Sequence, residues 1–321
     1  MHKKSFPAGS RPVSPISACL LLSVTVMIVG GVIGMFVWCC SSLARVPLLL
    51  GYYGYIWYSD TPRNCGSAYD GFSKSWLVEK LSGWFPFKIT ISEKLKPDSM
   101  KKSDQYLFAC HPHGINGEFR LFMDVKMRET FPNLASWRCL AASVVFYVPL
   151  LREISLYTHC IDAGKASATK AMKAGHSIIV VPGGEQEQML TRFQEEIVYL
   201  RKRKGFVRLA MENNAKIVPV YTFGMSDLYI PSGFLYDFRF WLMKRFRFVI
   251  CLYSGPFGLP IPFRVPLNMV FGEPISYPAT DGKPSKELVD KVHEEYCQSL
   301  VRLFDEHKSA YGYASRTLVI L

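Results

Sequence analysis

Two histidines stand where an apolar segment gives way to proline and glycine. The segment FACHPHGINGE places His111 and His113 just before Gly114, with Glu118 five residues beyond His113. Proline and glycine end a strand, so we expect the histidines at a strand's carboxyl end, where α/β sheets place ligands and catalytic groups. An imidazole oriented by a carboxylate can take a proton from an attacking hydroxyl. We predict His113 as a general base and Glu118 as its orienting carboxylate.

Two other accounts of this motif are weaker. Histidines can satisfy backbone carbonyls in a turn, but a turn alone does not call for two of them. A metal pair would need clear third and fourth ligands, and the sequence shows none, so we expect no metal site.

A second motif, SIIVVPGGEQEQ, carries an apolar run into Pro182, Gly183 and Gly184. Two glycines after a strand allow backbone N–H groups to point at a ligand oxygen, as in an oxyanion or phosphate site. A simple tight turn explains the pattern equally well. The motif alone leaves both readings open.

A basic run, RKRK over residues 201–204, opens a predicted helix and includes Arg203 and Lys204, followed by Gly205 and Phe206. Cations at a helix N-terminus suit the phosphates of coenzyme A. Most charge runs are solvated surface, and that explanation stands beside the functional one.

The composition narrows the class of protein. The chain has 321 residues, nearly half of them apolar, and a formal net charge of +12, which favours acidic partners or anionic lipid. Its nine cysteines include no C-x-x-C pair, so neither a zinc ribbon nor a disulfide framework is indicated. The apolar N-terminal region argues against a nucleic-acid partner.

The N-terminal region predicts membrane insertion. Residues 16–40 carry no charged side chain, and this run exceeds both the ~20 residues of a spanning helix and the ~7–15 of a signal-peptide core. Residues 46–58 form a shorter apolar run, either the return arm of a hairpin or an interfacial segment. Flanking lysines and arginines place both ends in the cytosol. We predict a cytosolic tail over residues 1–15, a transmembrane or re-entrant hairpin over 16–58, and a catalytic domain over 59–321.

The remainder predicts an α/β domain with a mixed central sheet. Short apolar runs indicate strands at residues 106–110, 143–148, 177–181, 217–223, 247–253 and 268–271. Amphipathic segments indicate helices at residues 165–174, 205–214 and 285–308.

Taken in order, these segments resemble the type 2 diacylglycerol acyltransferase family, which includes monoacylglycerol and wax-alcohol acyltransferases. The matching segments are WFPFKI, FACHPHG, VPLLRE, VVPGGEQE, RKGFVRLAM, KIVPVYTFG and VFGEPI, covering about residues 50–310. Glu185 and Met225 depart from the family pattern, and the chain looks closer to plant or protist members. These departures leave the acceptor open.

The resemblance implies a glycerolipid-acyltransferase-like domain at the endoplasmic reticulum membrane, with its active site facing the cytosol, and association with lipid droplets. It implies a fatty acyl-CoA donor, diacylglycerol and the lipid bilayer as partners and no prosthetic group, and it leaves a homo-oligomer open. His111, Arg152, Glu153 and Glu187 join the predicted site residues through the resemblance. The alternatives are monoacylglycerol or a fatty alcohol as acceptor, or a non-catalytic lipid-droplet scaffold, against which the intact His113 and Glu118 argue.

Overall fold

The computed structural model describes residues 30, 34, 37–76, 78, 83–95, 97, 100, 103–247 and 249–321. Within them, a seven-stranded sheet has the spatial order β1, β10, β7, β2, β5, β3, β4. Its strands are β1 (Phe87–Ile91), β2 (Tyr106–His111), β3 (Trp137–Ala141), β4 (Cys160–Asp162), β5 (Ser177–Val180), β7 (Lys216–Phe223) and β10 (Leu267–Phe271). Neighbouring strands are parallel except for the antiparallel pair β10 and β7. The predicted mixed sheet is confirmed.

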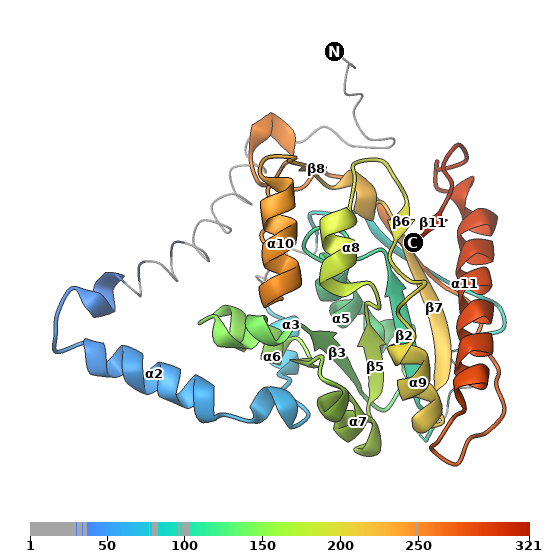
Figure 1. Cartoon of the computed structure of the whole chain (residues 1–321), viewed down its shortest axis with the longest axis horizontal. Helices are drawn as coiled ribbons and strands as arrows, with labels where there is room; N and C mark the ends of the chain where they lie inside the picture. Colours follow the sequence, from blue (N-terminus) through green and yellow to red (C-terminus); the bar gives the residue numbers. More distant parts are fainter. Residues whose placement is uncertain are drawn as a thin grey trace.

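Helices cover both faces of this sheet. Phe108 and Cys110 of β2 belong to one core with α5 (Phe119–Thr130), whereas Leu107 and Ala109 belong to the other. That second core includes residues of α7 (Lys165–Lys173), α9 (Gly205–Glu212) and α11 (Lys286–Lys308). Figure 1 shows α9 and α11 beside β7. Alternate strand residues point to opposite faces, so a sheet covered on both sides reads as an unbroken apolar run.

Shorter elements frame the sheet. The helices are α2 (Val46–Tyr58), α3 (Asp70–Ser73), α6 (Leu151–Tyr157), α8 (Gly184–Leu190) and α10 (Tyr236–Phe246). The 3-10 turns are η1 (Thr61–Arg63), η3 (Ser143–Tyr147), η4 (Met225–Asp227) and η5 (Pro256–Gly258). Strand β6 (Ile197–Val198) pairs with β11 (Val319–Ile320), and β8 (Ile230–Pro231) pairs with β9 (Tyr253–Ser254).

Most of the strand and helix predictions are confirmed. The predicted strands at 106–110, 177–181, 217–223 and 268–271 are β2, β5, β7 and β10, and the three predicted helices are α7, α9 and α11. The segment 143–148 instead contains the turn η3, and among the described residues of 247–253 only Tyr253 enters a strand. In η3 only Phe146 is buried, and β3, which comes just before η3 in the chain, is the strand that pairs with β5. An apolar run on the surface was mistaken for a core strand.

The structure corrects the prediction of a transmembrane hairpin over residues 16–58. In the part of the chain that is described, no helix combines the length and the apolar content needed to cross a membrane. The second predicted arm is α2, whose 13 residues span about 20 Å at ~1.5 Å per residue, against a hydrocarbon core of ~30 Å. The predicted tail (1–15) and most of the first arm (16–40) lie outside the described residues.

Candidate functional site

The His-Pro-His-Gly turn stands at the carboxyl end of the sheet, as predicted. His111 ends β2, which lies between β5 and β7, and its side chain is fully buried. The His111–Pro112 peptide bond is cis, and Gly114 follows with a φ of +65°. A Cβ at Gly114 would lie 2.6 Å from Met225 Cε, the flexible end of that side chain, so it is the positive φ that favours glycine here. This end of the strands is where α/β sheets place ligands.

Glu187 is the carboxylate that reaches both histidine residues. It lies on α8, which follows β5, a parallel neighbour of β2. Its Oε1 accepts a hydrogen bond from the His113 backbone N–H at 2.5 Å, and its Oε2 lies 3.7 Å from His111 Nδ1. Oε2 also accepts from the Tyr199 backbone N–H at 2.8 Å. Two backbone donors therefore hold this buried carboxylate in place beside the turn.

The proline-glycine turn makes this approach possible. A Cβ atom at Gly183 would overlap the Glu187 side chain, so only glycine lets the carboxylate fold back over the start of α8. Gly184 has a φ of +53°, and its N–H donates to the Val181 carbonyl at 3.2 Å. Pro182 precedes both glycines. The proline-glycine turn therefore determines the position of Glu187. That the backbone N–H groups of the turn bind an oxyanion stays a prediction.

The two imidazole rings differ in their hydrogen bonds. His113 Nδ1 lies 3.1 Å from the Gly114 carbonyl oxygen, which can only accept, so Nδ1 carries the proton and Nε2 is the basic nitrogen. Burial lowers the pKa of His113 and nearby Arg120 lowers it further, against an opposing effect of Glu187. The ring is therefore neutral at neutral pH. His111, although fully buried, makes no ring hydrogen bond to any described residue.

Glu118 is not joined to His113 by any hydrogen bond or ion pair that the described residues form. It precedes the first turn of α5, where its Oε1 accepts from Asn116 Nδ2 at 3.0 Å. Burial raises the pKa of Glu118, while the neighbouring Tyr229 hydroxyl opposes that rise. The carboxylate that the structure brings to the histidines is thus Glu187. Glu118 is close to His113 in the sequence but contacts Asn116 instead.

The basic run and the proline-glycine turn meet at one cavity. This cavity has a volume of about 430 Å³, and its lining includes Pro182, Gly184, Lys202, Lys204, Gly205 and Phe206. Arg203 Nη2 donates to the Gly183 carbonyl at 3.1 Å and to Gln186 Oε1 at 3.0 Å. Lys204 pairs with Asp290 at 2.8 Å. Arg203 therefore braces the turn. The exposed side chain of Lys202 forms neither a hydrogen bond nor an ion pair with the described residues.

Arg152 and Glu153 lie elsewhere, on α6. The fully buried Arg152 donates from Nη2 to Ser59 Oγ at 2.7 Å and stands 5.2 Å from the Tyr55 ring. These contacts tie α6 to the end of α2. Among the described residues, no hydrogen bond or ion pair links Arg152 or Glu153 to the histidines. Their predicted role in substrate binding is therefore separate from the His111 and Glu187 geometry.

Two contributors to the site had no signal in the sequence. Tyr199 acts through its backbone N–H, which every residue except proline possesses. Arg120 affects His113 through its charge from α5, where an arginine reads as an ordinary helix residue. Only their positions in the fold make them relevant.

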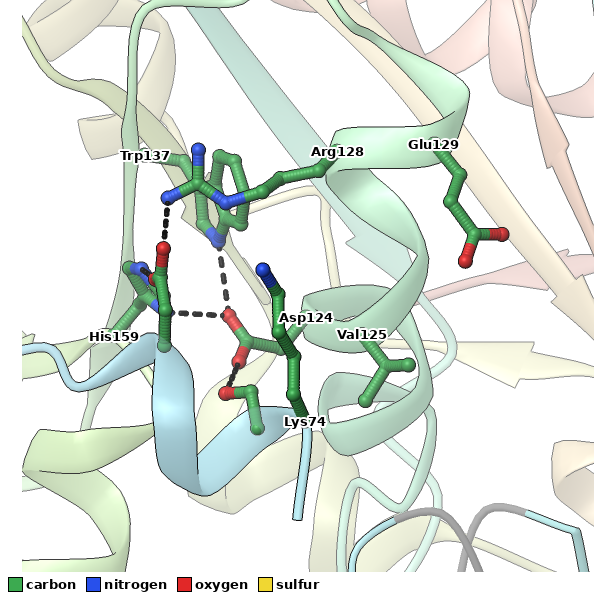
Figure 2. A pocket seen from close by; sticks show the side chains of 9 residues that line it. Lys74, Asp124, Val125, Arg128, Glu129, Trp137 and His159 are labelled. Atoms are coloured by element: carbon green, nitrogen blue, oxygen red, sulfur yellow. Dashed lines mark hydrogen bonds and ion pairs between the residues drawn. The ribbon is translucent and has the colours of Figure 1, made fainter.

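A second histidine-carboxylate cluster lies away from this turn (Figure 2). Asp124 of α5 accepts from Ser73 Oγ at 2.7 Å and from Trp137 Nε1 at 3.0 Å, and its Oδ1 lies 2.8 Å from His159 Nδ1. Asp70 pairs with Arg128 at 2.8 Å and lies 3.5 Å from His159 Nε2. We call these residues the Asp124 cluster. It links α3, α5 and the ends of β3 and β4, beside a cavity of about 440 Å³.

Comparisons with known proteins identify the family of this chain. The diacylglycerol acyltransferase family matches residues 35–321. Acyl-CoA wax alcohol acyltransferase 2 of Mus musculus is 30% identical over 85% of this chain and 85% of its own. Diacylglycerol O-acyltransferase 2 of Bos taurus is 29% identical over 88% and 80% respectively, and human 2-acylglycerol O-acyltransferase 3 is 29% identical over 80% and 79%. The chain therefore belongs to the diacylglycerol acyltransferase family and is an acyltransferase.

Proposed function

We propose that the protein esterifies the free hydroxyl of diacylglycerol with a fatty acyl group from acyl-CoA, giving triacylglycerol. Membership of the family supports the acyl-CoA-dependent transfer. The observation that carries the mechanism is the His113 ring, whose Nδ1 is held by the Gly114 carbonyl and whose pKa is lowered by burial. A neutral imidazole with one fixed nitrogen has the other ready to take a proton.

The reaction then needs one direct transfer and no prosthetic group. His113 Nε2 takes the hydroxyl proton as the acceptor oxygen bonds to the thioester carbonyl carbon. The C–S bond breaks, and the thiolate of coenzyme A leaves with the proton from the imidazolium. Glu187 raises the pKa of His113 through its charge, which stabilises the imidazolium during transfer. His111 supplies a fully buried ring whose Nδ1 lies 3.7 Å from Glu187 Oε2 and whose nitrogens make no hydrogen bond to the described residues.

The cavity at the basic run is the proposed site for the phosphates of acyl-CoA. Lys202 is exposed beside it, and the N-terminus of α9 begins at Gly205. Lys202→Gln should raise the KM for acyl-CoA about 2- to 5-fold without changing that for diacylglycerol, since one exposed contact contributes on the order of 0.5–1 kcal/mol. Lys173→Gln, at the far end of α7, is the matched control. Equal KM changes for both substrates would contradict this assignment.

A long-chain alcohol is the second candidate acceptor, because the mouse wax alcohol relative is as similar to this chain as the bovine diacylglycerol relative. Purified protein, labelled acyl-CoA and equal amounts of monoacylglycerol, diacylglycerol or hexadecanol separate these cases. We expect triacylglycerol to form fastest. Faster esterification of the alcohol would contradict the acceptor, and no transfer to any of them would contradict the function.

The same proposal places the enzyme at the endoplasmic reticulum membrane with the site facing the cytosol, and on lipid droplets, because diacylglycerol and triacylglycerol reside in these phases. Fractionation of cells that express the tagged chain, followed by protease digestion of intact microsomes, tests this placement. A tag at Leu321 that resists protease until detergent is added would contradict the cytosolic orientation.

A further inference from the structure

Helix α10 presents aromatic rings to the surface instead of burying them. Phe238, Trp241 and Phe246 are 54%, 53% and 59% exposed. Their rings contact one another, with Phe238 and Trp241 stacked at 6.0 Å and Trp241 meeting Phe246 edge-on at 5.9 Å. Phe234 and Leu235, just before the helix, are also exposed. A contiguous apolar patch of this kind marks an interaction surface.

The protein holds this patch in place by internal hydrogen bonds. Arg239 of α10 is buried and donates to the backbone carbonyls of Phe234, Ile250 and Ser232 at 2.9, 3.0 and 2.5 Å. Leu235 is fixed with a φ of +50°, a conformation that costs a non-glycine residue free energy. These hydrogen bonds therefore hold the loop before α10 in a defined conformation in which its apolar side chains are exposed.

The charges beside the rings identify the partner. Lys244 and Arg245 are exposed in the last turn of α10, where their cations lie 4.5 Å from the Phe240 ring and 5.5 Å from the Phe246 ring. Among the described residues neither has an acidic partner. Aromatic rings with adjoining cations are typical of segments that lie in the interface of an anionic bilayer. Tryptophan favours that depth because its ring is amphipathic.

The position of α10 connects this surface to the proposed catalytic site. Helix α10 packs beside α8, as Figure 1 shows, and Arg247 pairs with Glu185 of α8 at 2.9 Å. Glu187 lies two residues further along α8. We infer that the aromatic and basic face of α10 docks on the surface of an anionic lipid bilayer and brings the site to its lipid acceptor. This inference rests on the proposed lipid acceptor and adds the surface through which the lipid phase is reached.

Trp241 fluorescence tests the docking in the full chain without acyl-CoA. The emission that Trp241→Phe removes from the wild-type spectrum belongs to Trp241. With vesicles of phosphatidylcholine and phosphatidylserine, we expect this difference emission to shift to the blue and to be quenched by brominated acyl chains. The inference would be overturned if the vesicles neither shifted nor quenched this difference emission. So would a blue shift that depends only on protein concentration, because the surface would then cover a second copy.

Charge reversal tests the role of the cations. Lys244→Glu with Arg245→Glu should reduce the quenching of Trp241 at least several-fold on vesicles that contain phosphatidylserine. Lys286→Glu with Lys291→Glu, two exposed positions on α11, makes the same change in net charge and should leave the quenching unchanged. Equal losses in both variants would overturn local docking in favour of a general charge effect. Acyl transfer is assayed separately, so failure of the proposed function and failure of the docking are distinguishable.

Discussion

The His111–His113 turn and the Asp124 cluster both combine histidine with buried carboxylates, but they differ in how their polar atoms are paired. In the Asp124 cluster each nitrogen of His159 faces a carboxylate, and Asp124 also accepts from serine and tryptophan. At the turn, His111 Nδ1 lies farther from its carboxylate, 3.7 Å from Glu187 Oε2, and His111 Nε2 forms neither a hydrogen bond nor an ion pair with the described residues. Polar groups that hold a fold together are normally paired within it, and unpaired buried groups are costly. The Asp124 cluster thus joins elements of the fold through all its carboxylates, whereas Nε2 of His111 has no partner among the described residues.

Replacement of His113 by alanine should have the largest effect. Without the general base, we expect kcat to fall about 10²- to 10⁴-fold with the melting temperature unchanged. The measurement is acyl transfer from labelled acyl-CoA at saturating diacylglycerol, with folding checked by circular dichroism. A variant that keeps more than about half of the wild-type rate would remove His113 from the general-base role, because a missing base should cost about 3 kcal/mol or more.

Asp124→Ala should lower the stability of the protein and leave its catalytic rate nearly unchanged, the reverse of His113→Ala. It leaves Ser73 and Trp137 without their acceptor and removes the carboxylate beside His159, so we expect a loss of about 2–4 kcal/mol in the free energy of unfolding. The rate per folded molecule should remain near that of the wild type. Denaturant titration and activity normalised to folded protein give the two values. If kcat fell as far as in His113→Ala, the Asp124 cluster would belong to the catalytic machinery.

Glu187→Gln should lower kcat less than His113→Ala, by about 10- to 100-fold, because the amide oxygen still accepts a hydrogen bond but the charge is lost. The carboxylate raises the pKa of His113, so its neutralisation should lower that pKa further. The acid limb of the pH–kcat profile, where His113 becomes protonated, should then move to lower pH. An unmoved acid limb would show that Glu187 does not act on the group that titrates in catalysis.

Gly183→Ala should have the smallest effect of the four substitutions. It tests whether the close packing of Glu187 on Gly183 is required. The added Cβ overlaps Glu187, and we expect about 1–3 kcal/mol of destabilisation from the forced displacement, with reduced kcat. Gly205→Ala is the matched control because nothing lies within 4 Å of its Cβ position. If thermal melts show equal stability for both variants, the close packing of Glu187 on Gly183 is not required.

The local patterns predicted much of the fold. Four strands, three helices and the placement of His111 at the end of a central strand follow from apolar runs ended by proline and glycine. The predictions that were wrong concern apolar runs that lie on the surface of the protein. Ser143–Tyr147 is a turn beside α6, and α2 is too short to span a membrane. An apolar run reports that side chains avoid water, and only their neighbours decide whether they enter a sheet or cover a surface.

The sequence by itself determined the chemistry available to this protein: two histidines at a strand end, a proline-glycine turn, a basic run and an order of motifs specific to one acyltransferase family. Which groups meet was decided by the tertiary structure. Glu118, near His113 in the chain, bonds to Asn116, whereas Glu187, distant in the chain, reaches the His113 N–H. The physical reason is strand order. Because β2 and β5 are parallel neighbours, their carboxyl ends adjoin, and the segments that follow them come into contact whatever their separation in the chain.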